Sequence, residues 1–337
     1  MMWKIGLVGC GGVSSMHLDG CLERQDRVQL VAACDPDSAR VDAARRKYDI
    51  AHGFSSLTEM IAGSTWDVAV VCTPTNIRLQ VIRELAQAGK HIYVEKPMAS
   101  SLSEAHTMVQ VCAESGVQIA VDQNFRYFYP FHMAKTAIES GTIGRVKSIF
   151  HVDTGFRQDA GWRVHETRHA LSVMAVHWFD GFRWMLGEDP YAVYAQNRKS
   201  AAVNCAGETD SSVTLSFESG AIATCVQSFS SAVSQTSTVI IGDAGTIKLG
   251  YDGIEVHKLP TSDHVSVRVA NPIFGEHGEN KPASAFAGLD QLLSSIEMDV
   301  EPNNSGRDNL RTIAILEAAY ESSQRSAVVS IAPVNKQ

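Results

Sequence analysis

The sequence predicts an α/β protein in which residues 1–121 form a doubly wound parallel sheet and residues 122–337 form an α+β domain with a large, open, mostly antiparallel sheet. Three observations support this prediction. The chain of 337 residues exceeds the size at which one hydrophobic core usually stops growing. Its first third alternates short apolar runs with segments of helical spacing. The remaining residues read as successive strands joined by tight turns.

The first strand is predicted at residues 4–9, where the apolar run KIGLVG is bounded by glycine, as is typical of a buried parallel strand. A glycine-rich turn and a helix from Ser14 to about Arg24 follow it. The same pattern predicts strands at 28–35, 67–74, 91–97 and 117–124, and helices at 38–48, 77–89 and 102–116. This alternation implies right-handed crossovers, and therefore a parallel sheet.

The second half has strand patterns separated by turns such as Glu218-Ser219-Gly220, which indicate antiparallel neighbours. We expect strands at 146–156, 191–199, 211–220, 221–230, 236–245 and within 246–259, and helices near 131–140, 170–186, 284–299 and 306–324. These helices are too few to cover both faces of such a sheet. The uncovered face is therefore predicted to join subunits in a homodimer or homotetramer.

Composition excludes several classes of function. A formal net charge of -8, with no compensating run of Lys and Arg, argues against a nucleic-acid partner. The chain enters its first strand within a few residues, which leaves no room for a signal peptide, and no apolar segment reaches membrane-spanning length. Its 7 cysteines are scattered and never paired as C-x-x-C, so we expect a protein of the reducing cytoplasm.

The turn after the first strand indicates a dinucleotide site. It matches G-x-G-x-x-G/A at the first two glycines and has serine at the third: Gly9-Cys10-Gly11-Gly12-Val13-Ser14. Glycine permits the tight turn and lets backbone N–H groups approach a pyrophosphate at the helix start. Asp35 ends the second strand, where a carboxylate binds ribose hydroxyls and repels a 2′-phosphate. NAD is therefore predicted in preference to NADP, although Asp35-Pro36 could also be a simple strand-end turn.

Glu95-Lys96-Pro97, at the end of a predicted strand, resembles the signature of the glucose-fructose oxidoreductase, inositol dehydrogenase and MocA-like (Gfo/Idh/MocA) family. Other stretches resemble that family in the same order and extend the match over nearly the whole chain: GLVGCGGVSSMHL (6–18), VVCTPTNI (70–77), NFRYFYP (124–130), IESGTIGRVKSI (138–149), HWFDGFRWMLG (177–187) and LEAAYESSQR (316–325).

The resemblance implies a Rossmann domain, a bound nicotinamide cofactor, a sugar, polyol or related hydroxy substrate, and an active site between the two domains. It implies that Lys96 lies beside the substrate hydroxyl, before a cis Lys96-Pro97 bond. His177, followed by Asp180, fits the latter half of the family's D-x-G-x-H-x-x-D pattern. An imidazole can accept the hydroxyl proton while an ammonium stabilises the developing alkoxide. These are the catalytic roles expected of His177 and Lys96.

Two sets of contacts are expected. The cofactor set is Gly9, Gly11, Gly12, Val13, Asp35, Thr73, Pro74, Glu95 and Lys96. The substrate set is Asn124, Arg126, Trp162, Arg163, Arg168, His169 and Asp180, because arginine and tryptophan can build a polyol or carboxylate pocket from forked hydrogen bonds and stacking. Ordinary packing remains the alternative explanation for the second set.

Two positions depart from the family pattern. Val173 stands four residues before His177, where the family usually has aspartate, and Arg78 stands where histidine is common after the Thr73-Pro74 turn. The missing carboxylate favours an alternative function, a non-catalytic sensor or regulatory protein that binds NAD or a sugar.

A third hypothesis comes from His165-Glu166-Thr167-Arg168-His169, a literal match to the H-E-x-x-H signature of zinc proteases. On a helix, this spacing would put both histidines on one face, with His177 or Glu188 as a further ligand. A chain whose first third is built for a dinucleotide makes this hypothesis the weakest, and no metal is predicted.

Overall fold

The computed structural model describes residues 1–250, 253–260, 264–268 and 281–334. The chain divides into two compact units. The first contains residues 1–124 and 281–310, and the second contains residues 125–280 and 311–337. The first unit therefore includes a segment, 281–310, that was predicted to belong to the C-terminal domain.

The first unit is built on a sheet of six parallel strands in the order β3-β2-β1-β4-β5-β6. The strands are β1 (Trp3–Val8), β2 (Val28–Cys34), β3 (His52–Phe54), β4 (Val68–Val71), β5 (His91–Val94) and β6 (Ile119–Val121). All four residues of β4 are buried, as expected for a parallel strand covered on both faces. The predicted doubly wound sheet is confirmed.

The helices of this unit are α1 (Ser14–Leu22), α2 (Ser38–Tyr48), α3 (Leu57–Gly63), α4 (Arg78–Gln87), α5 (Leu102–Glu114) and α8 (Lys281–Met298), with a 3-10 turn η1 (Thr75–Ile77) before α4. Strand β3 and helix α3 were not predicted from the sequence. A signal for α3 exists, because Ser56 caps the helix by accepting a hydrogen bond from the Glu59 amide, and the Glu59 carboxylate bonds Ser55 in return.

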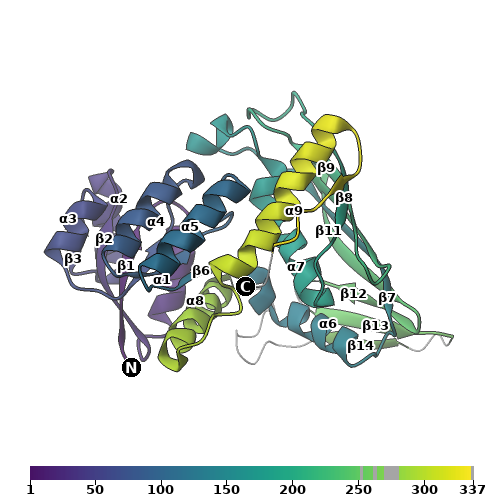
Figure 1. The fold of residues 1–337 in the computed structure, drawn as a ribbon, viewed down its shortest axis with the longest axis horizontal. Coiled ribbons are helices and arrows are strands. Elements are labelled where there is room, and N and C mark those ends of the chain that lie inside the picture. Colours follow the sequence, from purple (N-terminus) through teal and green to yellow (C-terminus); the bar gives the residue numbers. More distant parts are fainter. Residues whose placement is uncertain (251–252, 261–263, 269–280, 335–337) are drawn as a thin grey trace. The chain divides into compact units, whose positions relative to one another are not determined.

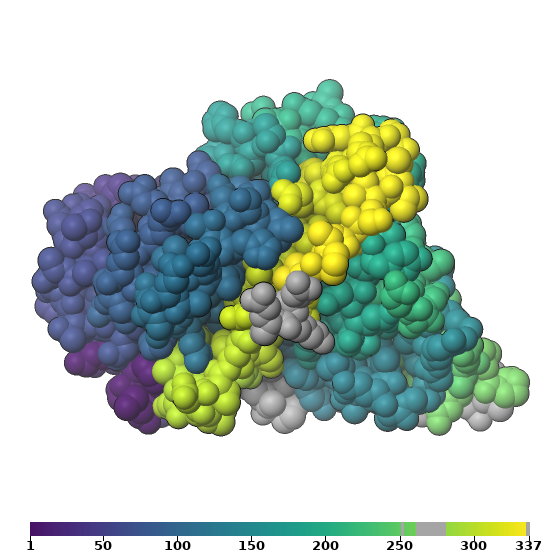
Figure 2. All heavy atoms as spheres, viewed as in Figure 1, coloured from purple at the N-terminus to yellow at the C-terminus, as the bar shows by residue number. Residues whose placement is uncertain are grey.

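Helix α8 packs directly on α1, although some 260 residues separate them along the chain. A Cβ at Gly20 would collide with the Pro282 carbonyl, so glycine is what permits this approach. Arg27 donates to Asp290 at 2.8 Å and to Glu297 at 2.7 Å, at the other end of the contact. In Figure 2 the yellow-green atoms of α8 lie beside the purple atoms of the N-terminal residues, in agreement with the packing of α8 on α1. These long-range contacts explain why 281–310 belongs to the first unit.

The second unit is built on a nine-stranded sheet in the order β14-β13-β12-β11-β7-β10-β9-β8-β15. The strands are β7 (Val146–Phe156), β8 (Ala192–Arg198), β9 (Asp210–Ser216), β10 (Ile222–Ser228), β11 (Ser230–Gly242), β12 (Gly245–Leu249), β13 (Gly253–Lys258), β14 (His264–Arg268) and β15 (Val329–Ser330). Only β7 and β10 run parallel within it. The mostly antiparallel sheet is confirmed, whereas β14 and β15 were not predicted.

Helices cover one face of this sheet (Figure 1). They are α6 (Tyr129–Glu139), α7 (Val176–Leu186) and the part of α9 (Gly306–Arg325) after residue 310, with short turns η2 (Asn124–Tyr127), η3 (Gly161–His165) and a π-helical turn η4 (Leu171–Ala175). Aromatic side chains from α6 and α7, including Phe131, Trp178 and Phe182, pack on inward residues of the strands such as Ile149 and Val213. None of the helices in the described part of the chain combines the length and apolar character required to cross a membrane.

Candidate active site

The glycine-rich turn joins β1 to α1 and has the geometry of a phosphate-binding turn. Gly9 has φ of 93°, and a Cβ there would lie 3.0 Å from the Thr73 nitrogen, so only glycine lets the turns after β1 and β4 approach so closely. At Gly11 and Gly12, an added Cβ would meet nothing within 4 Å. The turn therefore leaves open space beside the N-terminus of α1, as a pyrophosphate requires.

Asp35 is held against this turn. One carboxylate oxygen accepts a hydrogen bond from the Cys10 amide at 2.8 Å, and the other accepts from the Asp37 amide at 2.9 Å. The carboxylate is half-exposed, so it keeps lone pairs for ribose hydroxyls. A fixed negative charge at this point also repels a 2′-phosphate, which fits NAD better than NADP.

Polar atoms without partners mark the carboxyl ends of β4 and β6. Among the residues that the structure describes, no partner is found for the buried Thr73 Oγ1, for either amide atom of Gln123, or for Asn124 Oδ1. Buried polar atoms are normally hydrogen-bonded, and ligands of doubly wound sheets bind at the carboxyl ends of strands. These atoms therefore fit a ligand-binding edge. Gln123 was not singled out from the sequence, because a glutamine after a strand carries no motif.

Lys96 follows β5 at the same edge of the sheet. Its amide donates to Glu95 Oε2 at 3.1 Å, and the side chain is half-exposed. The Lys96–Pro97 peptide bond is cis, as the family resemblance implies. Pro74, at the end of β4, precedes η1 and is also half-exposed.

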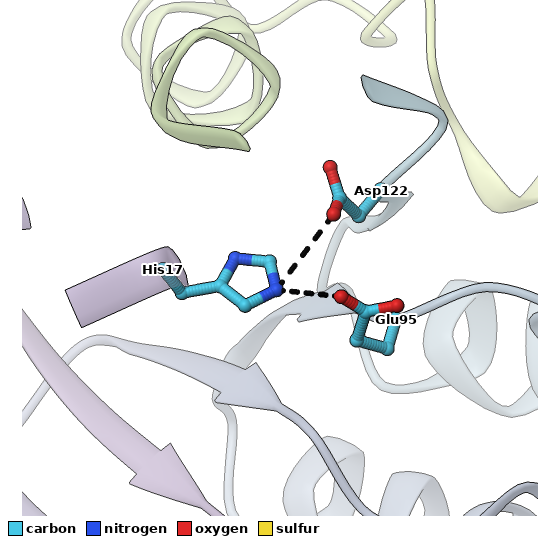
Figure 3. A group of neighbouring side chains, drawn as sticks. All are labelled: His17, Glu95 and Asp122. Carbon is cyan, nitrogen blue, oxygen red and sulfur yellow. Dashed lines mark hydrogen bonds and ion pairs between the residues drawn. The ribbon is translucent and has the colours of Figure 1, made fainter. Parts of the chain in front are cut away.

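The carboxylate of Glu95 belongs to a buried cluster with His17 on α1 and Asp122 after β6 (Figure 3). His17 Nε2 lies 2.8 Å from Glu95 Oε1 and 3.7 Å from Asp122 Oδ2. The Tyr93 hydroxyl donates to Asp122 Oδ1 at 2.7 Å. Three such groups could ligate a metal ion, but the direct contact of His17 with Glu95 is that of a hydrogen-bonded ion pair.

The pKa values in this cluster indicate how its protons are distributed. Burial alone would lower the pKa of His17, but Cys72, Glu95 and Asp122 together raise it well above its usual range. Burial opposes ionisation of Glu95, yet the contact with His17 lowers the pKa of that carboxyl. Burial and the neighbouring Glu95 raise the pKa of Asp122 to about 7. The cluster therefore holds an imidazolium, a carboxylate and a carboxyl that is largely neutral below pH 7.

Arg78 connects the turns after β4 and β5. Its side chain is 3% exposed. Nε and Nη2 donate to the Thr73 carbonyl at 3.0 and 2.7 Å, and Nη1 donates to the carbonyls of Glu95 and Pro97. The charged group thus binds backbone oxygens on both sides of Lys96. In the sequence, Arg78 is evident only as a departure from the family pattern.

In the second unit, His177 lies in the first turn of α7 and is buried. Its ring stacks on Phe125, with centroids 4.3 Å apart and planes 11° from parallel. Val173 lies in the π-helical turn η4 before α7, and its amide donates to the His169 carbonyl at 2.8 Å. Position 173 therefore supplies an apolar side chain where a carboxylate would be expected.

Arg126 and Asp180, both expected to contact substrate, bind each other. Two parallel hydrogen bonds of 2.6 Å join the guanidinium to the carboxylate, and Thr312 donates to Asp180 at 2.8 Å. Both side chains are almost fully buried. These contacts engage both oxygens of the carboxylate, which favours a structural role for the pair.

The H-E-x-x-H stretch does not form a helical metal site. His165 ends the 3-10 turn η3 and is exposed, whereas His169 is fully buried and binds Asp159 at 2.9 Å. Although burial opposes it, the contacts with His169 and Arg157 lower the pKa of Asp159. Residues 166–169 are not helical, so the two histidines do not share a helix face. Within the described ranges, the cluster of Figure 3 is the one triad with metal-ligand spacing, and it contains neither histidine.

The remaining expected substrate residues are Trp162, Asn124 and two arginines that lie over aromatic rings. The Arg163 guanidinium lies 5.0 Å from the ring of Trp162, and that of Arg168 lies 4.8 Å from the ring of Tyr320. Trp162 is 37% exposed, so it can still stack on a ligand. Asn124 Nδ2 contacts Ser284 Oγ on α8 at 3.4 Å, a long hydrogen bond.

Comparison with known proteins identifies two family models. One, described as an oxidoreductase family with an NAD-binding Rossmann fold, matches residues 3–123. The other, the GFO/IDH/MocA C-terminal domain, matches residues 131–248. Together they account for most of the chain.

Curated relatives align over nearly the whole length. The D-apiose dehydrogenase of Paraburkholderia graminis is 28% identical and is aligned over 98% of this chain and 90% of its own. The inositol 2-dehydrogenase of Rhizobium meliloti is 26% identical over 98% and 100%.

Solved structures have the same fold. The WlbA dehydrogenase of Bordetella pertussis, in complex with NADH and UDP-GlcNAcA, has a TM-score of 0.82 and 27% identity over 99% of this chain and 100% of its own. An oxidoreductase from Agrobacterium radiobacter, in complex with NAD+, L-tartaric acid and magnesium, has a TM-score of 0.89 at 23% identity, with 98% of each chain covered.

Proposed function

Because the chain belongs to the Gfo/Idh/MocA family of NAD-binding oxidoreductases, we propose that it is an NAD-dependent dehydrogenase of a sugar, an inositol-like polyol or a sugar acid. The reaction moves a hydride between a secondary alcohol carbon and the nicotinamide. The observation that carries this proposal is Asp35, fixed by the Cys10 amide beside an open glycine-rich turn. The names of the D-apiose and inositol dehydrogenases support the substrate class.

Bound NAD would supply the hydride acceptor. The groups that bind the cofactor, bind the substrate and accept the proton would come from this chain. Gly9, Gly11, Gly12 and Val13 would bind the pyrophosphate, Asp35 the ribose, and Thr73 and Pro74 the nucleotide where it crosses the end of β4. We propose that the other contacts with the cofactor also lie at the carboxyl ends of the parallel strands.

Lys96 and His177 are the proposed catalytic residues. The substrate hydroxyl must lose its proton as the hydride leaves carbon. The imidazole of His177 would accept that proton, and the ammonium of Lys96 would stabilise the negative charge that develops on oxygen. Asn124, Trp162, Arg163 and Arg168 are proposed substrate contacts, through hydrogen bonds and ring stacking.

The test is to supply NAD with a panel of aldoses, inositols and sugar acids and to record reduced nicotinamide. We expect turnover with at least one class, and a roughly 10²- to 10³-fold lower kcat for Lys96→Ala with NAD still bound. Undiminished turnover in Lys96→Ala would refute the catalytic assignment. Binding of NAD without any turnover, in either direction, would favour the sensor function, which is supported by Val173 at the position of the usual aspartate.

We also propose that the protein works in the cytoplasm as a homo-oligomer, with a second copy covering the outer face of the large sheet. Tyr194, Thr214, Thr224 and Phe150 form one cross-strand row over β8, β9, β10 and β7, and both aromatic rings are at least 41% exposed. A pair of aromatic rings on a sheet face is typical of a subunit interface. Light scattering should give a dimer or tetramer, and Phe150→Lys should shift it towards monomer.

A further inference from the structure

Glu95 has its hydrogen-bonding groups committed to the protein. Its amide donates to the Val71 carbonyl at 3.0 Å, and its own carbonyl accepts from Arg78. One carboxylate oxygen binds His17 and the other accepts from the Lys96 amide. The residue is 4% exposed. This arrangement suits a residue that holds its neighbours better than one that contacts a cofactor, the role first expected of it.

We propose that Glu95 is a positioning residue for Lys96: its carboxylate, oriented by His17, holds the Lys96 amide, while Arg78 holds the carbonyls of Glu95 and Pro97. The inference rests on the proposed function, because it concerns the lysine expected to act on the substrate hydroxyl. It deepens that function by assigning a role to three buried groups that do not touch the reacting atoms.

The backbone at Lys96 matters because the lysine side chain is long and half-exposed. Its four-carbon stem starts from the main chain, so a displacement of the backbone adds to the freedom of the side chain and moves Nζ away from the substrate hydroxyl. Displacement of a catalytic group by about 1 Å can lower a rate by about 10²-fold. Three hydrogen bonds, from the Lys96 amide and to the carbonyls of Glu95 and Pro97, restrain the turn on either side of the residue.

The buried carboxylate of Glu95 does not leave an unbalanced charge in the interior. His17, with Nε2 at 2.8 Å, neutralises the carboxylate. The other titratable groups near His17 are Cys21 on α1, Cys72 after β4, Tyr93 on β5 and Asp122 after β6. Asp122 accepts a hydrogen bond from the Tyr93 hydroxyl. Figure 3 shows the contacts of His17 with Glu95 and Asp122.

The experiment compares two conservative variants of Glu95 in the full-length enzyme. Glu95→Asp keeps the charge but is one methylene shorter, so the carboxylate cannot reach both His17 and the Lys96 amide. Glu95→Gln loses the charge but keeps the length. Its oxygen can still accept from the Lys96 amide, while its NH2 group donates to a neutral His17.

A positioning role predicts that Glu95→Asp lowers kcat by about 10- to 100-fold, whereas Glu95→Gln lowers it by less than about 3-fold. The dissociation constant for NAD should change less than about 3-fold in both. The matched control is Glu104→Asp, since the Glu104 carboxylate also accepts a backbone amide, that of Ser100, four residues after Lys96. That control should keep wild-type kcat.

Other outcomes would overturn the inference. A larger loss of kcat in Glu95→Gln than in Glu95→Asp would mean that the charge of Glu95 matters more than its reach. A large rise in the NAD dissociation constant at unchanged kcat would make Glu95 a cofactor contact.

Hydrogen exchange separates this inference from the proposed function. If Glu95 holds the turn, the Lys96 amide should exchange at least about 10-fold faster in Glu95→Asp than in wild type or Glu104→Asp, with or without a known substrate. A wild-type protein that turns over no sugar, polyol or sugar acid in either direction would refute the proposed function alone. An unchanged exchange rate at Lys96 would refute the positioning role even in an active enzyme.

Discussion

The two units each bury an ion pair, and the two pairs differ in what they touch. In the first unit, His17 binds Glu95, whose second oxygen holds the amide of Lys96. In the second unit, Arg126 grips Asp180 with two hydrogen bonds, and Thr312 completes the contact. The first pair ends at the backbone of a proposed catalytic residue, whereas the second ends within the packing of helices α7 and α9. Burial of charge alone therefore does not identify a functional group.

The cations also differ. Arginine stays charged at every accessible pH, so the pair of the second unit is permanent. An imidazole can release its proton, so the pair of the first unit depends on pH and on the neighbouring Asp122. We expect the second pair to determine stability, and the first to link stability, pH and turnover.

The largest expected effect is on the stability of the second unit. Asp180→Ala leaves the Arg126 guanidinium buried without its carboxylate, and removal of one partner of a buried pair usually destabilises by about 3–5 kcal/mol. Urea unfolding should show this loss. Asp243→Ala, which removes an exposed partner of Lys147, should have no measurable effect. Lost turnover at unchanged stability would instead make Asp180 a substrate contact.

The next effect is a pH dependence in the first unit. The pKa of Asp122 is raised to about 7 in the folded protein, so its contribution to stability is fully present below the unfolded pKa and is lost as pH rises towards 7. The free energy of unfolding of the wild type should fall between pH 5 and 7, by up to about 1.4 kcal/mol per pH unit for one proton.

Asp122→Asn should remove this pH dependence of stability, because the asparagine side chain can still accept the hydrogen bond from the Tyr93 hydroxyl but does not titrate. Asp42→Asn, on the exposed side of α2, is the control and should retain the slope. A wild-type slope that persists in Asp122→Asn would assign the titration to another group.

A smaller effect is expected from the second restraint on Lys96. Arg78→Met keeps the length of the side chain but removes its hydrogen bonds to the carbonyls of Thr73, Glu95 and Pro97. We expect kcat to fall about 10-fold, with partial recovery in Arg78→Lys, in steady-state assays. Arg83→Met, on the exposed side of the same helix, should remain as active as wild type.

The smallest effect concerns the choice of cofactor. Asp35→Ser removes the charge that disfavours a 2′-phosphate, so the ratio of the NADP to the NAD dissociation constant should fall by about 5- to 10-fold. Titration of nicotinamide fluorescence measures both constants. An unchanged ratio would mean that Asp35 only forms the turn at the end of β2 and does not contact the ribose. Asp42→Ser is the control.

Much of the fold could be predicted from local pattern. Buried apolar runs, bounded by glycine in the case of β1, identified β1, β2, β4, β5 and β6, because a strand covered on both faces has little freedom of composition. Strand β3, with the sequence HGF, has two exposed residues and therefore no buried apolar run, and β15 has two residues, too few to show a period. The assignment of 281–310 to the first unit depends on contacts with Gly20 and Arg27, which no local pattern reveals.

The site was predictable to the extent that backbone geometry demands particular residues. Gly9 and Asp35 were predicted as cofactor contacts because a phosphate turn needs glycine and a ribose needs a carboxylate after β2, and both assignments stay predictions. Gln123 was missed, since its only signal is a buried amide without partners. The H-E-x-x-H match does not indicate a metal site here. Its spacing puts both histidines on one face only when the segment is helical, and residues 166–169 are not.

The sequence by itself determined the parallel sheet, its glycine-rich turn and the position of Lys96 at the end of β5, since these follow from the periodicity and special φ requirements of short segments. Only the tertiary structure decided what the buried charges do. Glu95 binds His17 from a distant helix, and Asp180 binds Arg126 and Thr312. A carboxylate in a sequence looks the same in either role, because its partner is selected by the packing of elements far apart along the chain.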